Sequence, residues 1–545
     1  MTVDNQTKQR FESIKQESAR YHTVWKDICS YFLPTCGSFN EKPSDKVSLD
    51  YLKLLDADPN TYIVWLAAGM MSGMTNPSRE WFSLGTEKGI WGETPEEAEY
   101  LKKRRSLIEN TLHRSGVYLT LFKMYMELPT VGTYVFLVEK DPLNVMRTIP
   151  FTIGETYLGV GPNGKIDTFG CTHWLTPREM VAQFGDRVPG HIRDRAEKDG
   201  ASNERIAVYQ LIEPNRNRKP GALDSKSKAF RSVYWTGGVN EYLRESGYDR
   251  FPVICPRWDL KHHNAVWGMG PGWVALGAVK SLQRVTADEY LAVEMGIKPP
   301  LLAQSGAFKS EINLRPGAVL WQNQSVSDSV KPLFQAQMDL SKAELLVSKV
   351  KQTLKSQFFV DVMATMLADP KTNQTATEVA EKVQERLSIM GPVLERLVEE
   401  CHKPLIELAD AYNAEQGLYD DLVPPESLQG EELKITFNSI FHEAQKASGT
   451  RSMDMLMGSF GQYAQIKPEI LDLLDADKLG RLVAEKLSLT EMMLDEDKVS
   501  AVRQERADAQ QNAAEIEQAQ SAADISQKLA AAGKQTTGLD FRGGY

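Results

Sequence analysis

Residues 159–165 have the spacing of a phosphate-binding loop, with glycines at its two defining positions and Lys165 at its end. In such a loop the residue after the lysine is a serine or threonine that binds Mg²⁺. Here that residue is Ile166, and β-like residues flank the turn-forming Pro162-Asn163-Gly164. A phosphate-binding loop must also open a helix, so this pattern favours a hairpin turn between two strands. A nucleotide-dependent DNA-handling ATPase is kept as an alternative function.

Two further patterns could carry chemistry, and each has a simpler structural explanation. Gly268, Gly270 and Gly272 resemble a shortened dinucleotide-binding fingerprint, but no clear strand precedes them, and a tight loop before a helix is favoured. His262 and His263 are adjacent, so they do not share a helix face, and no second cluster of carboxylates or histidines lies at ligand spacing. We therefore predict no metal, no cofactor and no catalytic residue, and we do not expect an enzyme.

The cysteine pattern indicates a reducing compartment. The cysteines are odd in number and widely spaced, and they predict neither a disulfide framework nor a zinc site: Cys29, Cys36, Cys171, Cys255 and Cys401. The N-terminal residues lack the apolar core of a signal peptide. The most apolar helical stretch, residues 62–74, is shorter than the roughly 20 residues that span a membrane. We expect no membrane span, and a protein made in a cytoplasm or carried in a particle assembled there.

Composition and charge are those of a soluble globular chain of several units. The 545 residues are 42 % hydrophobic and 25 % charged, and a typical domain of roughly 150 residues gives about three or four units. The formal net charge is -10, so a contact with DNA would lack tight overall attraction. The strongest basic run, residues 102–105, follows glutamates at helical spacing, such as Glu99 before Lys103. That run favours a solvated helix face over a nucleic-acid patch.

The order of the elements predicts a helix-rich α+β fold. Residues 1–259 form an α+β body, and two long helices enclose a non-helical insert, so that they make an antiparallel stalk with a knob at one end. The second helix begins at the capping box formed by Ser341 and Glu344. The segments after the body are helix 271–295, insert 296–340, helix 341–368, loop 367–374, a helix within 375–447 kinked at Gly391-Pro392, a helical unit 448–532 and a disordered tail 533–545.

Both stalk helices carry residues at regular helical spacing. On the second helix one apolar face is made by Val347, Val350, Leu354 and Phe358. Three lysines lie away from that face: Lys342, Lys349 and Lys355. On the first helix Lys280, Arg284 and Asp288 follow one another at steps of four. An ordinary amphipathic helix with solvated charges has the same pattern, so spacing alone leaves both interpretations open.

Several motifs, taken in order, resemble the portal proteins of short-tailed bacteriophages. The resemblance covers roughly residues 10–450, and it rests on the order and spacing of the motifs rather than on any one of them. The motifs are Met71 to Pro77 followed by Trp81-Phe82, Gly116-Val117-Tyr118 leading to Val131-Gly132-Thr133, Phe251-Pro252-Val253 with Arg257-Trp258, the run from Trp267 to Gly272, and Thr375 to Val379 continuing to Gly391-Pro392 and Glu399.

The resemblance implies a ring, usually a dodecamer, that surrounds a DNA channel at one capsid vertex. It implies that residues 1–259 form a wing, 271–295 and 341–368 the stem, 296–340 a clip and 448–532 a crown, with 367–374 as a channel loop. Such a ring serves genome packaging, tail attachment and DNA ejection. Its expected partners are double-stranded DNA without sequence specificity, a terminase motor, capsid and scaffold proteins, and tail adaptor proteins. Its expected location is the virion, with assembly in the host cytoplasm.

Site residues follow from this resemblance together with the stripes on the helices. The DNA-channel candidates are Asp369, Lys371, Thr372, Asn373, Lys342, Lys349 and Lys355. The subunit-interface candidates are Val347, Val350, Leu354 and Phe358. The clip and tail-adaptor candidates are Phe308, Ile312, Leu314, Val319 and Trp321. A monomeric α-helical virion scaffold or adaptor is a further alternative to a portal, besides the ATPase.

Overall fold

The chain is seen in a computed structural model. It describes residues 3–39, 54–86, 94–198, 204–218, 224–237, 241–297, 301–303, 330–332, 340–367, 389–430 and 433–438, with a few short stretches between 480 and 528. Contacts divide the chain into two units, Met1–Gln445 and Lys446–Tyr545. The second unit is described only at isolated positions, so the fold below is that of the first.

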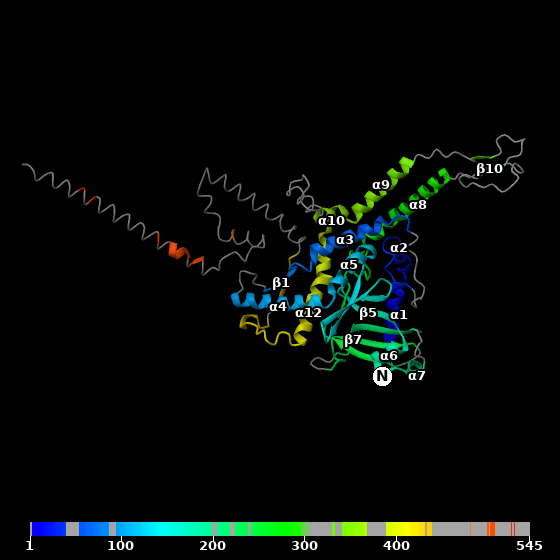
Figure 1. Ribbon diagram of the computed structural model, residues 1–545. Coiled ribbons are helices and arrows are strands. Elements are labelled where there is room, and N and C mark those ends of the chain that lie inside the picture. Colours follow the sequence, from blue (N-terminus) through cyan, green and yellow to red (C-terminus); the bar gives the residue numbers. More distant parts are fainter. Residues whose placement is uncertain are drawn as a thin grey trace, which may run out of the picture. The chain divides into compact units, whose positions relative to one another are not determined.

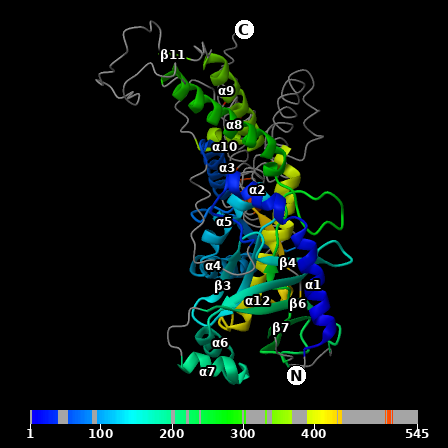
Figure 2. The ribbon, with the colours of Figure 1, turned by 90° about the vertical axis from the view of Figure 1, so that its right-hand side faces the viewer.

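A five-stranded antiparallel sheet forms one part of the body, in the order β4-β5-β6-β7-β8. Helix α1 (Asn5–Ala19) lies along the β4 side of this sheet (Figure 2). Its buried residues recur at helical spacing, and Phe11 stands edge-on to Tyr157 and Trp235 at 5.4 and 5.2 Å between ring centroids. The strands are β4 Thr156–Val160, β5 Ile166–Leu175, β6 Ile206–Pro214, β7 Phe230–Thr236 and β8 Arg244–Tyr248.

Short helices and a second sheet complete the α+β body (Figure 1). The second sheet is antiparallel, in the order β3-β2-β9, and helix α6 begins at a capping box made by Thr176 and Glu179. The elements are β2 Val135–Asp141, β3 Val145–Phe151, β9 Val253–Ile254, α6 Pro177–Phe184, η3 Gly185–Arg187 and α7 Gly190–Lys198.

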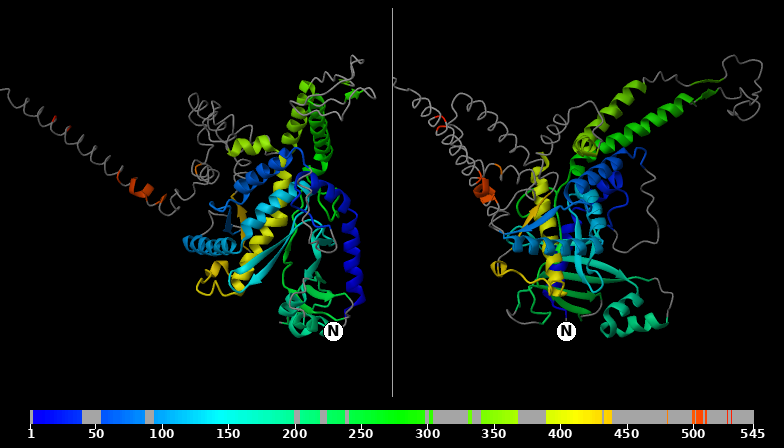
Figure 3. Two further views of the ribbon diagram at one scale, coloured as in Figure 1. Left: turned by 45° about the vertical axis from the view of Figure 1, so that its right-hand side comes forward. Right: turned by 60° about the vertical axis from the view of Figure 1, so that its left-hand side comes forward.

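A layer of helices joins the sheets to the stalk. Helix α4 begins at a capping box of Thr94 and Glu97, and α5 ends at Gly132. Strands β1 and β12 pair although they are far apart in the sequence, and α12 runs past α4 and β3 (Figure 3). The elements are α2 His22–Phe32, α3 Asp58–Met74, β1 Phe82–Gly85, α4 Pro95–Arg114, α5 Val117–Val131, η4 Val398–His402, α12 Lys403–Glu415, η5 Glu426–Leu428 and β12 Lys434–Phe437.

The two-helix stalk consists of α8 (Pro271–Ile297) and α9 (Leu340–Gln357), which lie side by side (Figures 1 and 2). Beyond their far ends β10 (Leu301–Ala303) pairs antiparallel with β11 (Val330–Pro332), so the chain turns back there. The near ends of both helices belong to the same hydrophobic core as α2, α3 and α5. The stalk is therefore rooted in the body and is not a separate hairpin.

The second stalk helix is shorter than the sequence predicts. The expected helix 341–368 is interrupted after Gln357, and α10 (Val360–Leu367) follows in a new direction. Phe359 lies at the break with a φ of 53°, in the left-handed region. The break lets α10 pack on α3, where Gly69 leaves room for Met363: an added Cβ at Gly69 would lie 2.2 Å from the Met363 sulfur. Tertiary packing on α3 thus overrides the continuous helical pattern.

The sequence predicts a kink at Gly391-Pro392, and the structure has an irregular turn further along the same helix. Residues 389–397 are helical, and the wide π turn is η4, Val398–His402. Pro404 follows directly, and it has no N–H to donate to the carbonyl of Glu400. A π turn accommodates that missing bond, because Lys403 N–H donates to Val398 five residues earlier. Residues 368–388, with the expected capping box at Thr375, lie outside the described residues, as do almost all of 448–545.

The hairpin interpretation of residues 159–165 is confirmed. Strands β4 and β5 pair on either side of the turn, and Gly161 N–H donates to the Lys165 carbonyl at 2.9 Å. No helix follows Lys165, so the segment has no place for a phosphate at a helix N-terminus. This removes the structural basis that the sequence offered for an ATPase.

Candidate functional site at the base of the stalk

The glycine run before α8 lies directly against the end of α5. An added Cβ would lie 2.2 Å from the Gly132 carbonyl oxygen at Gly268, 2.4 Å from that of Pro129 at Gly270, and 2.4 Å from that of Thr130 at Gly272. Only glycine allows backbone atoms to approach this closely. The run therefore joins the body to the stalk by backbone contact, and the spacing that resembled a dinucleotide fingerprint has a structural cause.

A buried ion pair holds the segment before the stalk to the π turn. The Arg257 side chain is 3 % exposed, and its Nη2 and Nε donate to the Glu400 carboxylate at 2.6 and 3.1 Å. Its Nη1 donates to the carbonyl of Ala265 at 2.8 Å, and Nη2 also donates to that of Gly164 at 3.2 Å. The backbone N–H of Arg257 donates to the Glu400 carboxylate at 3.0 Å. Four of the five N–H groups of the guanidinium thus have acceptors, which offsets the cost of burying its charge.

The π turn directs the next side chain into another part of the core. His402 Nε2 lies 3.0 Å from the hydroxyl of Tyr125. Its imidazole is edge-on to Trp81 at 5.8 Å and tilted to Phe437 at 6.1 Å between ring centroids. Burial lowers the pKa of His402 to about 3, so the ring is neutral at ordinary pH. This neutral contact ties the later helix to α5 and to the β1–β12 pair.

Both stalk helices are fixed to the short segment that precedes α3. From α8, Gln283 accepts hydrogen bonds from the N–H groups of Leu55 and Asp56 at 2.9 and 3.1 Å. From α9, Lys351 Nζ lies 2.7 Å from the Asp56 carboxylate and 2.8 Å from that of Asp58. Burial would lower the pKa of Lys351, but the two carboxylates outweigh it and raise the pKa. The two helices thus share one polar anchor.

Aromatic side chains fix α8 and the segment before it to α2 and α5. The ring of Trp25 on α2 lies 4.7 Å from that of Trp267, edge to face, and Trp273 Nε1 on α8 donates to the carbonyl of Val131 on α5 at 2.8 Å. Further out, Lys280 Nζ lies 2.7 Å from the Asp27 carboxylate. The three residues that the sequence places at steps of four on α8 therefore differ in their surroundings. Lys280 contacts Asp27 of α2, whereas Arg284 and Asp288 are exposed.

Glu127, on the last turns of α5, is a buried acid close to this joint. Burial raises the pKa of Glu127 to about 7, against the opposing charge of Lys123 and a hydrogen bond from Thr152. The Thr152 hydroxyl donates to Oε2 at 3.1 Å, whereas Oε1 has no hydrogen-bond partner among the described residues and lies 3.7 Å from Lys123 Nζ. The carboxyl group is therefore half protonated near neutral pH.

This acid should make the protein less stable as the pH rises. Its pKa is higher in the folded state than its ordinary value of 4.5, so the folded state holds a proton that the unfolded state releases. Stability from this group is full below about pH 4.5 and is lost between that value and about pH 7. The free energy of unfolding should fall by about 3 kcal/mol over this range.

The variant Glu127→Gln tests this expectation. The loss of unfolding free energy between pH 5 and pH 8 that Glu127 causes should be absent from this variant in denaturant unfolding curves. The control variant Glu99→Gln, at an exposed position, should show the same loss of unfolding free energy as the natural chain. If the two variants lose the same amount between pH 5 and pH 8, Glu127 is not the cause of the pH dependence.

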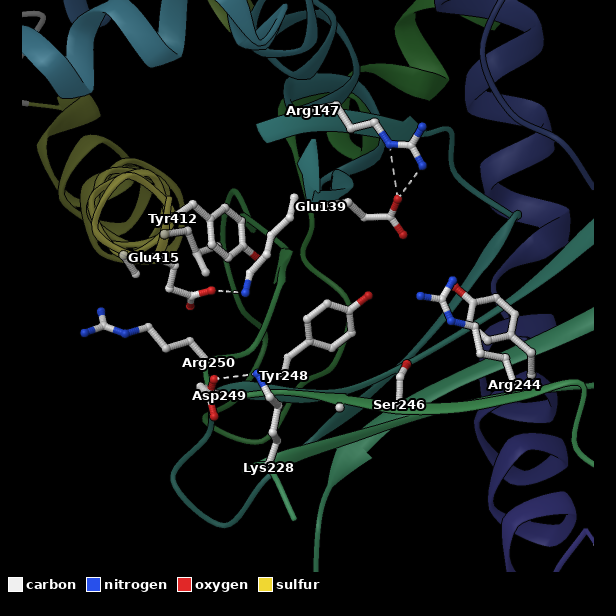
Figure 4. Close-up of a pocket in the computed structure, with 15 residues that line it drawn as sticks. Glu139, Arg147, Lys228, Arg244, Ser246, Tyr248, Asp249, Arg250, Tyr412 and Glu415 are labelled. Carbon is white, nitrogen blue, oxygen red and sulfur yellow. Dashed lines mark hydrogen bonds and ion pairs between the residues drawn. The ribbon is translucent and has the colours of Figure 1, made fainter. Parts of the chain in front are cut away.

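A cavity of about 330 Å³ lies away from the stalk, between the β2–β3 hairpin, β8 and α12 (Figure 4). Its charged residues are paired with one another: Arg147 Nη2 lies 2.7 Å from Glu139, Lys228 lies 2.8 Å from Asp249, and Lys140 contacts Glu415. None of the lining residues forms a pair of nucleophile and base, and no glycine loop borders it. Within the described ranges no group of three His, Cys, Asp or Glu residues could hold a metal ion.

The predicted channel residues are only partly described. Lys349 and Lys355 are exposed on α9, and Lys355 Nζ lies 5.7 Å from the ring centroid of Tyr62. Lys342 belongs to α9, but its side chain is outside the described part of the chain. The remaining candidates all fall outside the described residues: Asp369, Lys371, Thr372 and Asn373.

The apolar face of α9 is divided between the core and the surface. Leu354 and Phe358 are fully buried within the chain, and the Phe358 ring lies 5.4 Å from that of Phe32. Val347 and Val350 are half-buried. Of the four interface candidates, these two keep surface that the chain itself does not cover. The clip candidates lie outside the described residues: Phe308, Ile312, Leu314, Val319 and Trp321.

Three polar residues that fix the base of the stalk are absent from the sequence-based candidates. Arg257 and Glu400 are 143 positions apart, and Gln283 reaches its partners over 227 and 228 positions. No helical or strand period connects residues at such separations. The one signal available was that Arg257 and Glu400 stand in or beside the motifs that carry the family resemblance.

Similarity to known proteins agrees with this architecture. The family described as bacteriophage head to tail connecting protein matches residues 4–494. The portal protein of Salmonella phage epsilon15 is 33 % identical over 519 residues, which cover 94 % of this chain and 92 % of that protein. The probable portal protein of Bordetella phage BPP-1 is 32 % identical over 525 residues, which cover 95 % and 94 %. No described helix is long and apolar enough to cross a membrane. The chain belongs to the bacteriophage head-to-tail connecting protein family.

Proposed function

We propose that copies of this chain assemble into a ring at one vertex of a phage head, and that double-stranded DNA enters and leaves through the ring. Membership of the family supports a portal or head-to-tail connector function. The ring and its channel go beyond the family assignment. They rest on one observation, the apolar surface on the outer part of the stalk.

The outer part of the stalk exposes six large apolar side chains among the described residues. Their exposed fractions range from 41 to 73 %, and they lie beyond the part of the stalk that packs on the body: Tyr290, Leu291, Val293, Ile297, Leu345 and Leu346. A clustered apolar surface of this kind indicates a protein contact. Identical copies are the natural occupants, because soluble oligomers are mostly symmetric assemblies of one chain.

In this proposal α8 and α9 form the stem, the insert 296–340 forms the clip, and residues 1–259 form the wing. The antiparallel pairing of β10 and β11 supports a compact insert at the end of the stem. Tail adaptor proteins would bind the clip, with Phe308 to Trp321 as contact candidates, and the crown would comprise residues 448–532. Val347 and Val350 would lie at the contact between neighbouring stems.

DNA would pass along the channel without recognition of its sequence. The candidates facing it are the exposed Lys349 and Lys355, with Asp369, Lys371, Thr372 and Asn373 in the loop 367–374. Phosphate contacts do not identify bases, and a net charge of -10 for each chain disfavours tight binding. A separate terminase would drive packaging, and capsid and scaffold proteins would hold the ring in the virion after assembly in the host cytoplasm.

Leu345→Glu is expected to block ring assembly without unfolding the chain. Leu345 is 70 % exposed on α9, so its loss removes little from the core, but a glutamate there would place a charge in every subunit contact. Native mass measurement should give multiples of 61.1 kDa, near a dodecamer, for the natural chain, and single chains for the variant.

The matched control is Gln352→Glu, which introduces the same charge at another exposed position of α9. It should assemble normally. If Leu345→Glu also assembles, this surface is not the subunit contact. If the natural chain itself remains a 61.1 kDa monomer at high concentration, the monomeric scaffold or adaptor becomes the better function.

A further inference from the structure

Two of the five cysteines face each other at the end of α2. The Sγ atoms of Cys29 and Cys36 are 3.0 Å apart, and both side chains are buried. A disulfide bond is about 2.05 Å long, so the two sulfur atoms need to move by only about 1 Å to form one. The sequence did not suggest this pair. The spacing of Cys29 and Cys36 matches no known cysteine motif, and the turn that brings them together is visible only in the structure.

Backbone contacts hold both cysteines in place. Leu33 N–H donates to the Cys29 carbonyl at 2.9 Å, and Cys36 N–H donates to the Leu33 carbonyl at 2.9 Å, so a tight turn closes the segment. Just beyond it, Gly37 N–H donates to the Thr152 hydroxyl at 2.6 Å and Ser38 N–H to the Ile153 carbonyl at 2.9 Å. Hydrogen bonds therefore hold this segment to α2 on one side and to Thr152 and Ile153 on the other. They keep the two sulfur atoms close together.

The other three cysteines, all within the described ranges, have different neighbours. Cys171 Sγ lies 3.0 Å from His173 Nε2, and Cys401 Sγ lies 3.5 Å from the Met124 sulfur. Cys255 is buried. Only the first pair combines two thiols, close approach and a fixed backbone.

We propose that Cys29 and Cys36 are a redox site that closes to an intrachain disulfide in an oxidising medium. The oxidant is a small-molecule disulfide. One thiolate attacks it and releases one thiol of the oxidant, and the second cysteine then displaces the other. Two protein thiols are oxidised to one S–S bond, and one small disulfide is reduced to two thiols, which take up the two protons.

The pair is suited to stay reduced while the chain folds. Its hydrogen bond with Cys29, together with burial, raises the pKa of the Cys36 thiol, so the reactive thiolate is rare at neutral pH. Closure would link the last turn of α2 to the segment 33–38, which is hydrogen-bonded to Thr152 and Ile153, and α2 packs against α8. The bond would therefore secure the root of the stalk in particles that have left the reducing cytoplasm. That timing rests on the proposed virion function, whereas the chemistry of the pair does not.

Peptide mapping tests the proposal on the full chain. Trypsin cleaves after Lys26 and Lys46, and Lys42 is protected by Pro43, so both cysteines fall in the peptide 27–46. The protein is incubated with oxidised glutathione or with a reductant, denatured and alkylated. After oxidation we expect this peptide to be two hydrogen atoms lighter and unalkylated, whereas the peptides of Cys171, Cys255 and Cys401 remain alkylated. Oxidation should also raise the midpoint of thermal unfolding by about 2–4 °C.

Single variants separate a closed pair from general oxidation. Cys29→Ser and Cys36→Ser should each lose the oxidant-dependent thermal shift, and Cys171→Ala should keep it. Three results would overturn the proposal: alkylation of both cysteines in the oxidised natural chain, glutathione attached stably to either one, or an equal thermal shift in the single variants. The experiment does not depend on ring assembly, so its failure and that of the portal proposal are distinguishable.

Discussion

Replacing Gly132 with alanine is expected to prevent the stalk from docking on the end of α5. Gly132 has a φ of +92°, in the region that favours glycine. An added Cβ would lie 2.4 Å from the Gly268 carbonyl oxygen and 2.6 Å from the Met269 Cα. These are backbone atoms, which cannot move aside as the end of a side chain can. Backbone strain of about 1–3 kcal/mol and overpacking of similar size should together lower the free energy of unfolding by about 4 kcal/mol.

Gly277→Ala is the matched control for this prediction. Gly277 lies within α8, and an added Cβ there would meet nothing within 4 Å. The same substitution should therefore stabilise the protein by about 1 kcal/mol, because glycine is a poor helix former. Soluble yield and thermal unfolding of the two variants should change in opposite directions. A Gly132→Ala protein whose unfolding midpoint lies within about 2 °C of the natural chain would show that the joint is looser than described.

The parts of this structure that follow local rules could be predicted from the sequence. The β4–β5 hairpin follows from a turn triplet between two β-like runs, and α8 follows from a proline at its start and helical spacing after it. The stalk follows from two long helical patterns around an insert rich in glycine and proline. In each case the controlling interactions lie within a few residues along the chain, and a single sequence contains them.

The departures from prediction arise from contacts between distant segments. The helical pattern through Phe358 and Phe359 gives no sign of a break, because its cause is the fit of Met363 against Gly69 on α3. The sequence predicts a kink at Pro392 but gives no sign of the π turn before Pro404, where Glu400 makes its contacts with the distant Arg257.

The candidate site shows the same division. Spacing identified Leu354 and Phe358 as an apolar face, but it could not show that α2 and α3 of the same chain cover them. It also could not find Lys351, whose importance comes from Asp56 and Asp58, nearly 300 positions earlier. The glycine run was correctly taken as a tight loop, yet its partner, the end of α5, is visible only in three dimensions.

Arg257→Ala should be among the most damaging single changes of a charged residue in this chain. The substitution leaves the Glu400 carboxylate without its cationic partner. It also removes the hydrogen-bond donors of the Ala265 and Gly164 carbonyls. Breaking a buried ion pair by removal of one partner costs about 3–5 kcal/mol. The loss should appear as a lower free energy of unfolding in denaturant titrations. Because Arg257 precedes the stalk, the rings proposed for the natural chain should also be lost at a lower temperature in this variant.

Two comparisons decide whether this loss comes from the pair itself. Lys103→Ala breaks the exposed contact with Glu99 at 2.7 Å, and an exposed pair contributes less than about 1 kcal/mol. Glu400→Ala and the double variant Arg257→Ala/Glu400→Ala complete a cycle with Arg257→Ala. If the pair is the cause, the double variant should be less destabilised than the sum of the two single variants, because neither charge is then left alone. Additive losses, or an Arg257→Ala cost as small as that of Lys103→Ala, would mean that the ion pair does not hold the stalk segment to the π turn.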